Sequence, residues 1–216
     1  GKESNTALVE LKSPYDTIGD PRNNSVYLEW RNLRPLLSSL DEDFSSGEYG
    51  EWFVENPNKD LTWNIKHWIN NSGRNEAMQL EFQRMSNGVG QIDHLYVPAL
   101  DLRNKNKPYL KFDYAYTSRY APVFTDSIFV QVSVNCAQTW DTIYVNGGAA
   151  MQTRPDLNSV FIPKPGEWKQ DTLDLSAYAG ISEGVALRFT GKNDLGNNFF
   201  LDNVYLGDRL VSNNSE

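Results

Sequence analysis

One acidic residue lies in a strongly apolar stretch of the sequence, where burying its charge would cost free energy. Asp202 stands in the apolar run FFLDNVYLG, residues 199–207, and Asn203 follows it. A carboxylate buried among apolar side chains costs free energy unless a partner offsets its charge. Carboxylate and amide oxygens are ligands that Ca²⁺ prefers. Asp202 and Asn203 are therefore candidate metal ligands, and the alternative is that Asp202 accepts hydrogen bonds from loop amides.

A second acidic group, Asp41, Glu42 and Asp43, lies in the segment LDEDF, residues 40–44. These acids do not have the spacing of an EF-hand calcium loop. Two interpretations stay open. They either bind a cation or form a charged run in contact with solvent.

Two further stretches are candidates for ligand binding. The loop GKNDLGNN, residues 191–198, offers Asn193, Asp194 and Asn197 to a cation or a sugar hydroxyl, although Gly and Asn are also what a tight turn requires. The segment YAYTSRYAPVF, residues 114–124, reads as a long aromatic loop, and such loops often carry binding. Its candidate contact residues are Tyr116, Arg119 and Tyr120, with ordinary packing as the alternative.

Catalytic residue patterns are poorly represented. A nucleophilic Cys136 needs a base in hydrogen-bond reach, and the two histidines, His67 and His94, lie in separate apolar segments. We expect Cys136 to be a small buried residue. No phosphate-binding glycine motif occurs, and Asp93, Asp113 and Asp126 are isolated in the sequence. The sequence therefore predicts no enzymatic activity.

Charge and composition narrow the class of protein. The 216 residues include 28 acids and 20 bases, giving a formal net charge of −8. This argues against a nucleic-acid partner, which requires a basic patch. No run reaches the roughly 18 apolar residues of a membrane-spanning helix. One cysteine excludes an internal disulfide. No signal peptide opens the sequence, and the polar start after Gly1 is compatible with a removed export signal.

Alternating apolar and polar residues predict the elements that must position these candidates. About a dozen short strands are separated by turn-rich segments, a pattern typical of an all-β sandwich. One helical turn is predicted at 175–180. The predicted strands are 7–12, 25–30, 51–56, 62–69, 77–84, 91–100, 108–117, 126–135, 141–147, 167–176, 184–191 and 198–207.

An ordered series of segments resembles the MAM-like, cleaved-adhesin-type jelly-roll domains of bacterial secreted and cell-surface proteins. The most recognisable is DSIFVQVSVNCAQTWDTIYVNGG, residues 126–148. It departs from the family pattern at Ala137, where Gly is usual, and at Asn135, where Asp is frequent. The other matching segments are LDEDFSSG (40–47), LTWNI (61–65), LYVPALDL (95–102), YLKFDYAY (109–116), FIPKPGEWKQDTLDLSAYAG (161–180), VALRFTGKNDLGNN (185–198) and FFLDNVYLG (199–207).

The resemblance implies a two-sheet β-sandwich with jelly-roll topology, of the galactose-binding or MAM-like type, over residues 37–208. Residues 1–36 would be a strand pair or the remnant of a preceding module, and residues 209–216 a polar tail. The first and last strands of the jelly roll would then bring residues 41–43 beside Asp202. A structural Ca²⁺ is implied between them, and packing positions are implied for Trp52, Trp63, Trp140 and Trp168.

The function implied is that of a secreted or cell-surface module without catalysis, which adheres to a glycan or to a host or matrix protein. A different interpretation is a structural accessory domain with no ligand of its own. A third is a β-sandwich glycoside hydrolase or lyase, which would need two carboxylates facing each other across a groove. The sequence predicts no nucleic-acid partner and no membrane insertion, and it leaves the oligomeric state open.

Overall fold

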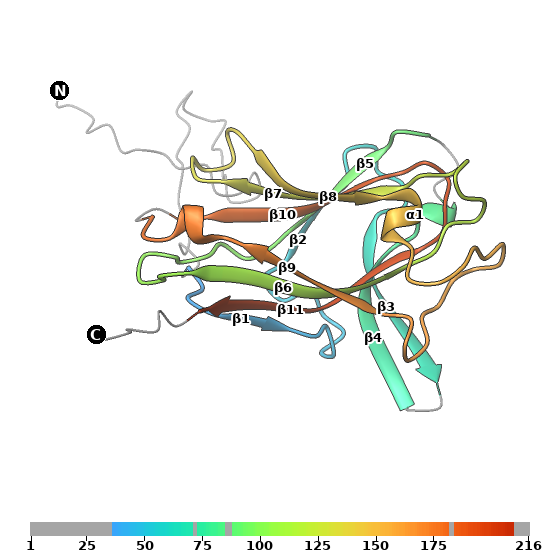
Figure 1. Ribbon diagram of the computed structural model, residues 1–216, viewed down its shortest axis with the longest axis horizontal. Coiled ribbons are helices and arrows are strands. Elements are labelled where there is room, and N and C mark those ends of the chain that lie inside the picture. Colours follow the sequence, from blue (N-terminus) through green and yellow to red (C-terminus); the bar gives the residue numbers. More distant parts are fainter. Residues whose placement is uncertain (1–35, 71–72, 85–87, 182–183, 210–216) are drawn as a thin grey trace, which may run out of the picture.

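The computed structural model describes residues 36–70, 73–84, 88–181 and 184–209, which form two antiparallel sheets packed face to face (Figure 1). This confirms the predicted all-β sandwich with jelly-roll topology. The predicted strands at 7–12 and 25–30 and nearly all of the polar tail lie outside the described residues. The predicted module boundary near residue 36 stays a prediction.

The first sheet has six strands, and its central strand β11 pairs with three others. In order, its strands are β3 (Trp63–Asn70), β4 (Gly73–Leu80), β11 (Phe199–Asp208), β6 (Pro108–Tyr116) and β9 (Lys169–Asp174), with β1 (Leu40–Glu42) also pairing with β11.

The second sheet has five strands. Their order is β2 (Phe53–Glu55), β5 (Ile92–Tyr96), β10 (Ala186–Lys192), β7 (Ser127–Ser133) and β8 (Asp141–Gly147). The short helices of the described chain are η1 (Phe82–Arg84), α1 (Gly148–Met151) and η2 (Ser176–Tyr178), and η2 is the predicted helical turn.

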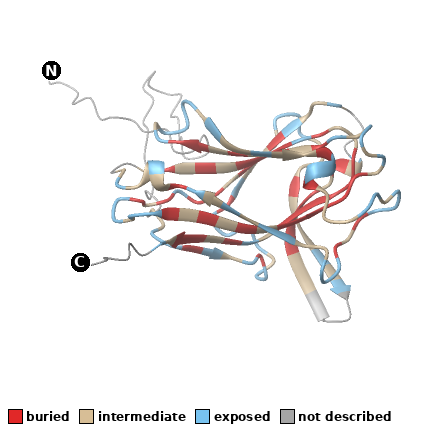
Figure 2. Cartoon of the chain, viewed as in Figure 1, coloured by how far each residue is buried: buried red, intermediate tan, exposed pale blue. Residues whose placement is uncertain are grey.

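The core lies between the sheets, because alternate residues of each strand point inwards (Figure 2). Phe112 of one sheet meets Phe189 of the other edge to face, with ring centroids 5.2 Å apart. Burying one such side chain contributes about 1.5–3 kcal/mol to stability. Trp52 and Trp63 are buried in this core, as the resemblance implied.

The outer face of the six-stranded sheet carries a second, smaller core. Phe161 lies on Phe200 of β11 with ring centroids 5.8 Å apart, and Ala77 and Ala115 are buried beside them. Trp168 packs against the same cluster. The segment around residues 157–168 therefore covers part of this face.

The turn between β7 and β8 corrects one expectation. Cys136 is exposed, not buried. Its φ is 57° and that of Ala137 is 62°, so two successive residues adopt the left-handed conformation. Glycine adopts this conformation without strain, which explains why the resembling family has Gly where this chain has Ala137. The departure from the family pattern leaves the turn in place.

Candidate functional site

Asp202 lies where β11 exchanges one neighbour for another. Along one edge, β11 pairs with β4 as far as Leu201 and with β1 from Val204 onwards. On the opposite edge its pairing with β6 shifts register between Asp202 and Tyr205. Asn203 has a φ of 49°, typical of a bulge residue. The bulge therefore explains how an acid fits into an apolar strand.

Acids of three strands surround this bulge. Burial and, to a smaller extent, the charges of Asp43, Asp113 and Glu42 together raise the pKa of Asp202 to about 7, against a hydrogen bond from the Asn203 backbone N–H. Asp113 lies opposite Asp202 in the β6–β11 register, and Asn203 Nδ2 donates to Asp113 Oδ2 over 2.9 Å. Sequence reasoning left Asp113 isolated, because only the pairing of β6 with β11 places it here.

The three acids of residues 41–43 differ in their position relative to Asp202. Asp41 is exposed and pairs with Tyr205, away from the group that raises the pKa of Asp202. Glu42 Oε1 accepts from the Phe44 N–H over 2.8 Å, and Asp43 Oδ1 from the Ser45 N–H over 2.9 Å.

These bonds direct one oxygen of each acid towards the main chain. Among the described residues, no three His, Cys, Asp or Glu side chains converge as a metal site. A cation at the bulge would therefore require Glu42 or Asp43 to turn towards Asp202.

The buried Asp126 side chain holds the amide-rich loop, residues 191–198, through hydrogen bonds. Asp126 Oδ1 accepts from the backbone N–H groups of Asp194 (2.6 Å) and Gly196 (3.1 Å), and Tyr116 donates its hydroxyl to Oδ2 over 3.0 Å. Burial raises the pKa of Asp126 to about 6 although these three bonds oppose it. Asp194 in turn accepts from the backbone and hydroxyl of Thr125.

The predicted ligand residues of this loop serve the same structural purpose. Asn193 and Asn197 are both fully buried. Asn197 Nδ2 donates to the carbonyls of Leu157 and Ser159, while its Oδ1 accepts from the Phe161 N–H. The turn interpretation of residues 191–198 therefore fits the structure better than ligand binding.

The aromatic segment 114–124 also differs from the prediction. Tyr116 is fully buried and spends its hydroxyl on Asp126, so it is inaccessible to a ligand. Arg119 is partly buried, and Tyr120 is 51% exposed. Of the three predicted contact residues, Tyr120 alone presents a large surface.

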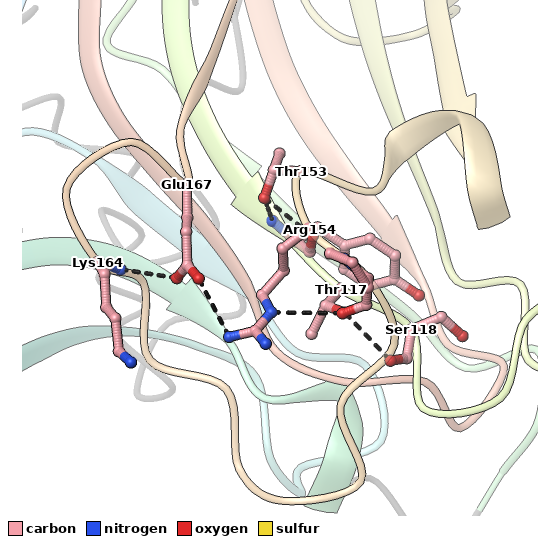
Figure 3. Close-up of polar contacts among 8 residues, drawn as sticks. Thr117, Ser118, Thr153, Arg154, Lys164 and Glu167 are labelled. Atoms are coloured by element: carbon pink, nitrogen blue, oxygen red, sulfur yellow. Dashed lines mark hydrogen bonds and ion pairs between the residues drawn. The ribbon is translucent and has the colours of Figure 1, made fainter.

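The segment beyond β6 is braced by residues 153–167 (Figure 3). Thr153 Oγ1 donates to the Tyr116 carbonyl over 3.0 Å, and Thr117 donates to the Pro155 carbonyl over 2.9 Å. Arg154 pairs with Glu167 over 3.1 Å. These contacts fix the base of the loop and leave Tyr120 near its tip.

Two rows of side chains cross the outer face of the five-stranded sheet. They follow from the register, because residues opposite one another on neighbouring strands share a face. The first row is Phe53, Tyr96, Arg188, Gln131 and Thr142, and the second is Glu55, His94, Thr190, Phe129 and Val145. Intervening residues such as Leu95, Leu187 and Val130 point into the core.

Arg188 is the centre of these rows. Its guanidinium lies 4.1 Å from the ring centroid of Trp140, the residue before β8, and 5.7 Å from that of Tyr96. Arg188 Nε donates to Gln131 Oε1 over 2.9 Å, and Nη1 donates to the Tyr96 hydroxyl over 3.0 Å. Trp140 is only partly buried and packs against Arg188 and Tyr96 on this outer face, so it is a packing residue outside the core.

The hydrogen bonds of this network have a defined direction. Gln131 Oε1 must accept, because Arg188 Nε can only donate. Thr190 gives its single hydroxyl hydrogen to the same oxygen, so His94 Nδ1 donates to Thr190 Oγ1 over 2.8 Å. At the other end Tyr96 donates to Glu55 over 2.6 Å.

His94 is neutral at physiological pH. Burial and, to a smaller extent, the nearby Arg188 charge together lower the pKa of His94 to about 4, against the charge of Glu55. The Nδ1–H tautomer leaves Nε2 as an acceptor. Within the described residues, Arg188 Nη2 and His94 Nε2 form no hydrogen bond, so a donor and an acceptor are left for a ligand.

Sequence reasoning missed this face. The period-2 pattern of residues 92–96, 127–133 and 186–192 does identify the outward positions. It does not say which strands are neighbours. The signal was present as polar and aromatic residues at alternate positions of three predicted strands, but it needed the strand order to become a site.

A small pocket lies elsewhere, at one end of the sandwich. Its volume is about 200 Å³, below the usual 300–1,000 Å³ of a small-molecule site. Val89, Thr125, Ser127, Lys192, Asn193 and Asp194 line it. In the described part of the chain, no helix is long and apolar enough to cross a membrane.

Solved structures share this fold. The K1 cleaved adhesin domain of Lys-gingipain from Porphyromonas gingivalis W83 aligns with a TM-score of 0.55 and 17% identity, over 80% of this chain and 99% of that one. CBM27-1 of Caldicellulosiruptor saccharolyticus, solved in complex with mannohexaose, aligns with a TM-score of 0.54 and 12% identity, over 78% and 96%.

A carbohydrate-binding module, CBM28, described as specific for non-crystalline cellulose, aligns with a TM-score of 0.50 and 13% identity, over 78% and 94% of the two chains. No protein-family model matches the sequence. No curated protein matches it either. The chain therefore has the β-sandwich fold of cleaved adhesin domains and carbohydrate-binding modules, and the likeness extends to the fold alone.

Proposed function

We propose that the chain is a non-catalytic extracellular recognition module that binds a glycan on the outer face of its five-stranded sheet. The observation that carries the proposal is the Arg188 network. The rings of Tyr96 and Trp140 lie beside Arg188, and Phe53 packs on Tyr96. Arg188 and His94 keep a donor and an acceptor for a partner. Sugars offer both C–H faces for aromatic rings and hydroxyls for such polar groups.

Preorganisation supports this choice of site. Arg188 is held by two hydrogen bonds and an aromatic ring, so little side-chain entropy remains to be lost on binding. Residues of all five strands contribute to the two rows, which gives a rigid surface. The solved relatives in fold include modules that bind mannohexaose or cellulose, which makes these sugars suitable first probes.

The proposal includes a structural Ca²⁺ at the bulge. Asp202 and Asp43 would supply carboxylate oxygens, with Glu42 and Asn203 as further ligands, whereas Asp41 faces away. Hard oxygen donors suit Ca²⁺, and a cation would offset both the burial of Asp202 and the repulsion from neighbouring acids, which together raise its pKa. The narrower MAM-like assignment, carried by the ordered sequence segments, and a secreted or cell-surface location belong to the same proposal.

A structural accessory domain is the second candidate, and one observation favours it. The polar groups of the sheet face bond mostly to one another, from His94 through Thr190 and Gln131 to Arg188 and on to Glu55. Such a satisfied network is stable without a ligand. We do not propose a glycoside hydrolase, because the two rows contain a single carboxylate, Glu55, where hydrolysis needs two.

Glycan and matrix-protein arrays test the proposal, followed by calorimetry with mannohexaose and cello-oligosaccharides. We expect a glycan hit whose affinity Arg188→Ala and Trp140→Ala each reduce at least about tenfold, as for central contact residues. Lys192→Ala is the matched control, because it removes a positive charge from an exposed position of the same strand outside the two rows. Silence on both arrays would favour the accessory domain, and protein-only hits would redirect the proposal to a protein ligand.

Thermal melting tests the calcium part separately. Ca²⁺ binding to the folded state raises the melting temperature, and a chelator reverses the effect. We expect Asp202→Asn to reduce this shift. No response to Ca²⁺ in the unmodified protein would contradict the ion and leave glycan recognition to be judged on the array.

A further inference from the structure

A buried acid on β5 lacks the partners that such a group requires. The Asp93 side chain is 1% exposed, and its Oδ1 has no hydrogen-bond donor among the described residues. The amide oxygen of Gln91 is buried nearby with the same deficit, and the Thr62 hydroxyl lies beside the Asp93 carboxylate without a hydrogen bond of normal geometry. Buried polar atoms in native proteins are nearly always paired, so the Gln91 oxygen and the poorly satisfied Asp93 carboxylate point to a missing partner.

Asp93 lies between the two sheets. It has the inward orientation of Leu95, two residues further along β5, and faces the segment that leads into β3. Trp63, the first residue of β3, donates its indole N–H to the Asp93 carbonyl over 3.3 Å. Two residues before Thr62, a second acid, Asp60, adds its charge to the surroundings of Asp93.

The side-chain nitrogen of Gln91 lies within hydrogen-bond distance of three oxygens beside Asp93. Gln91 Nε2 lies 2.5 Å from Asp60 Oδ1, 3.3 Å from Asp93 Oδ2 and 3.4 Å from the Leu61 carbonyl. An amide NH₂ has two hydrogens, so it cannot donate fully to all three. The position between the two carboxylates is therefore richer in acceptors than a neutral side chain can satisfy.

The charge at this place is also uncompensated. Burial raises the pKa of Asp93 to about 6 against hydrogen bonds from Thr62 and Gln91, and the charge of Asp60 contributes to the rise. Ion pairs of the described chain involve other acids, namely Glu76, Glu81, Asp101 and Glu167. A divalent cation would neutralise both carboxylates at once.

We propose that Asp60, Thr62 and Asp93 form a calcium site between the sheets, separate from the bulge at Asp202. The Leu61 carbonyl adds a main-chain oxygen. A 180° turn of the Gln91 amide adds its oxygen and removes its N–H groups from the ion. These donors are hard oxygens and include both oxygens of Asp93, which approaches the 6–8 ligands that Ca²⁺ takes. The ion would tie the segment before β3 to β5 and so join the two sheets.

Terbium luminescence and calorimetry on the full chain test this site. Tb³⁺ replaces Ca²⁺, and Trp63 is adjacent and can sensitise its emission. Asp202→Asn serves as the background, because it removes a main ligand of the bulge. In this background we expect one Ca²⁺ per chain and Tb³⁺ emission that Ca²⁺ displaces. Adding Asp93→Asn should weaken Ca²⁺ binding on the order of tenfold or more, because ligand charge sets affinity.

Asp60→Asn is the second variant, since Asp60 lies in a partly exposed loop where folding is less at risk. Asp141→Asn is the matched control, because it removes one charge from an exposed position at the start of β8. It should bind Ca²⁺ as the background does. The proposal is overturned if the background binds no Ca²⁺, or if Asp93→Asn and Asp60→Asn leave its affinity unchanged. Because glycan binding is measured on the sheet face, the two proposals fail independently.

Discussion

Asp126 and Asp93 are two buried acids with nearly the same titration behaviour and different surroundings. Burial raises the pKa of each to about 6. Asp126 accepts three hydrogen bonds through both oxygens. Asp93 accepts one long bond at Oδ2, and its Oδ1 forms none of normal geometry although the Thr62 hydroxyl lies beside this carboxylate. In both cases the raised pKa reflects burial. The two acids differ in the hydrogen bonds that they accept: Asp126 is a structural clamp that holds the loop 191–198, and Asp93 is a candidate ion ligand.

The largest expected effect is at the clamp. Asp126→Ala leaves the amides of Asp194 and Gly196 and the hydroxyl of Tyr116 without their acceptor. Each buried unpaired group costs about 1–3 kcal/mol, so with three such groups we expect the free energy of unfolding to fall by at least about 3 kcal/mol. Urea denaturation measures this. Asp126→Asn keeps one acceptor oxygen and should lose less, and equal losses for the two variants would argue against the clamp.

Removing a single donor from the clamp should have a smaller effect. Tyr116→Phe deletes one hydroxyl that donates to Asp126 and preserves the buried ring. We expect a loss of about 1 kcal/mol in the free energy of unfolding, the usual value for one hydrogen bond. A loss as large as that of Asp126→Ala would mean that the ring, not the carboxylate, organises this region.

With chelator present, replacing Asp93 should destabilise the protein less than replacing Asp126. Asp93→Ala removes one weak acceptor, and Gln91 keeps Asp60 as a partner. We therefore expect the free energy of unfolding to fall by no more than the cost of one unsatisfied group, which is about 1–3 kcal/mol. Added Ca²⁺ should widen the gap to the unmodified protein and leave the loss in Asp126→Ala unchanged. A cation-independent loss at Asp93 that matched the loss at Asp126 would remove the distinction between the two acids.

The pH dependence offers the finest comparison. An acid whose folded pKa is about 6 holds protons that the unfolded chain releases near pH 3.9. The stability from these two acids is thus complete below about pH 4 and falls as the pH rises to about 6. In chelator, Asp93→Asn and Asp126→Asn should each flatten this fall, as followed by denaturation from pH 4 to 7.

His94 acts with the opposite sign in the same range. Its folded pKa of about 4 lies below the unfolded value near 6.5, so the unfolded state binds more protons between them. Stability from His94 therefore rises as the pH increases from about 4 to 6.5. His94→Gln should remove this rise without changing the contribution of the two acids. An unchanged pH profile would mean that His94 is more hydrated than its contacts imply.

Local sequence pattern predicted much of the fold and less of the sites. Alternation placed β8 at 141–147 as observed, and β6 and β11 within one residue at each end. For residues 191–198 the Gly and Asn residues left ligand binding and a tight turn open, and the buried side chains of Asn193 and Asn197 fit the turn. Local pattern could not show that Tyr116 is buried or that Cys136 is exposed, because both depend on what packs above the strand end or turn.

The sequence by itself determined the strands and which side of each strand is apolar, because side-chain direction alternates with a period of two. Only the tertiary structure decided which polar groups meet. Asp126 meets backbone amides some 70 residues away, and Asp93 meets residues about 30 positions earlier. Strand order and register set these distances. Since burial and charge act through space, the partners of an acid could be identified only once the sheets were paired.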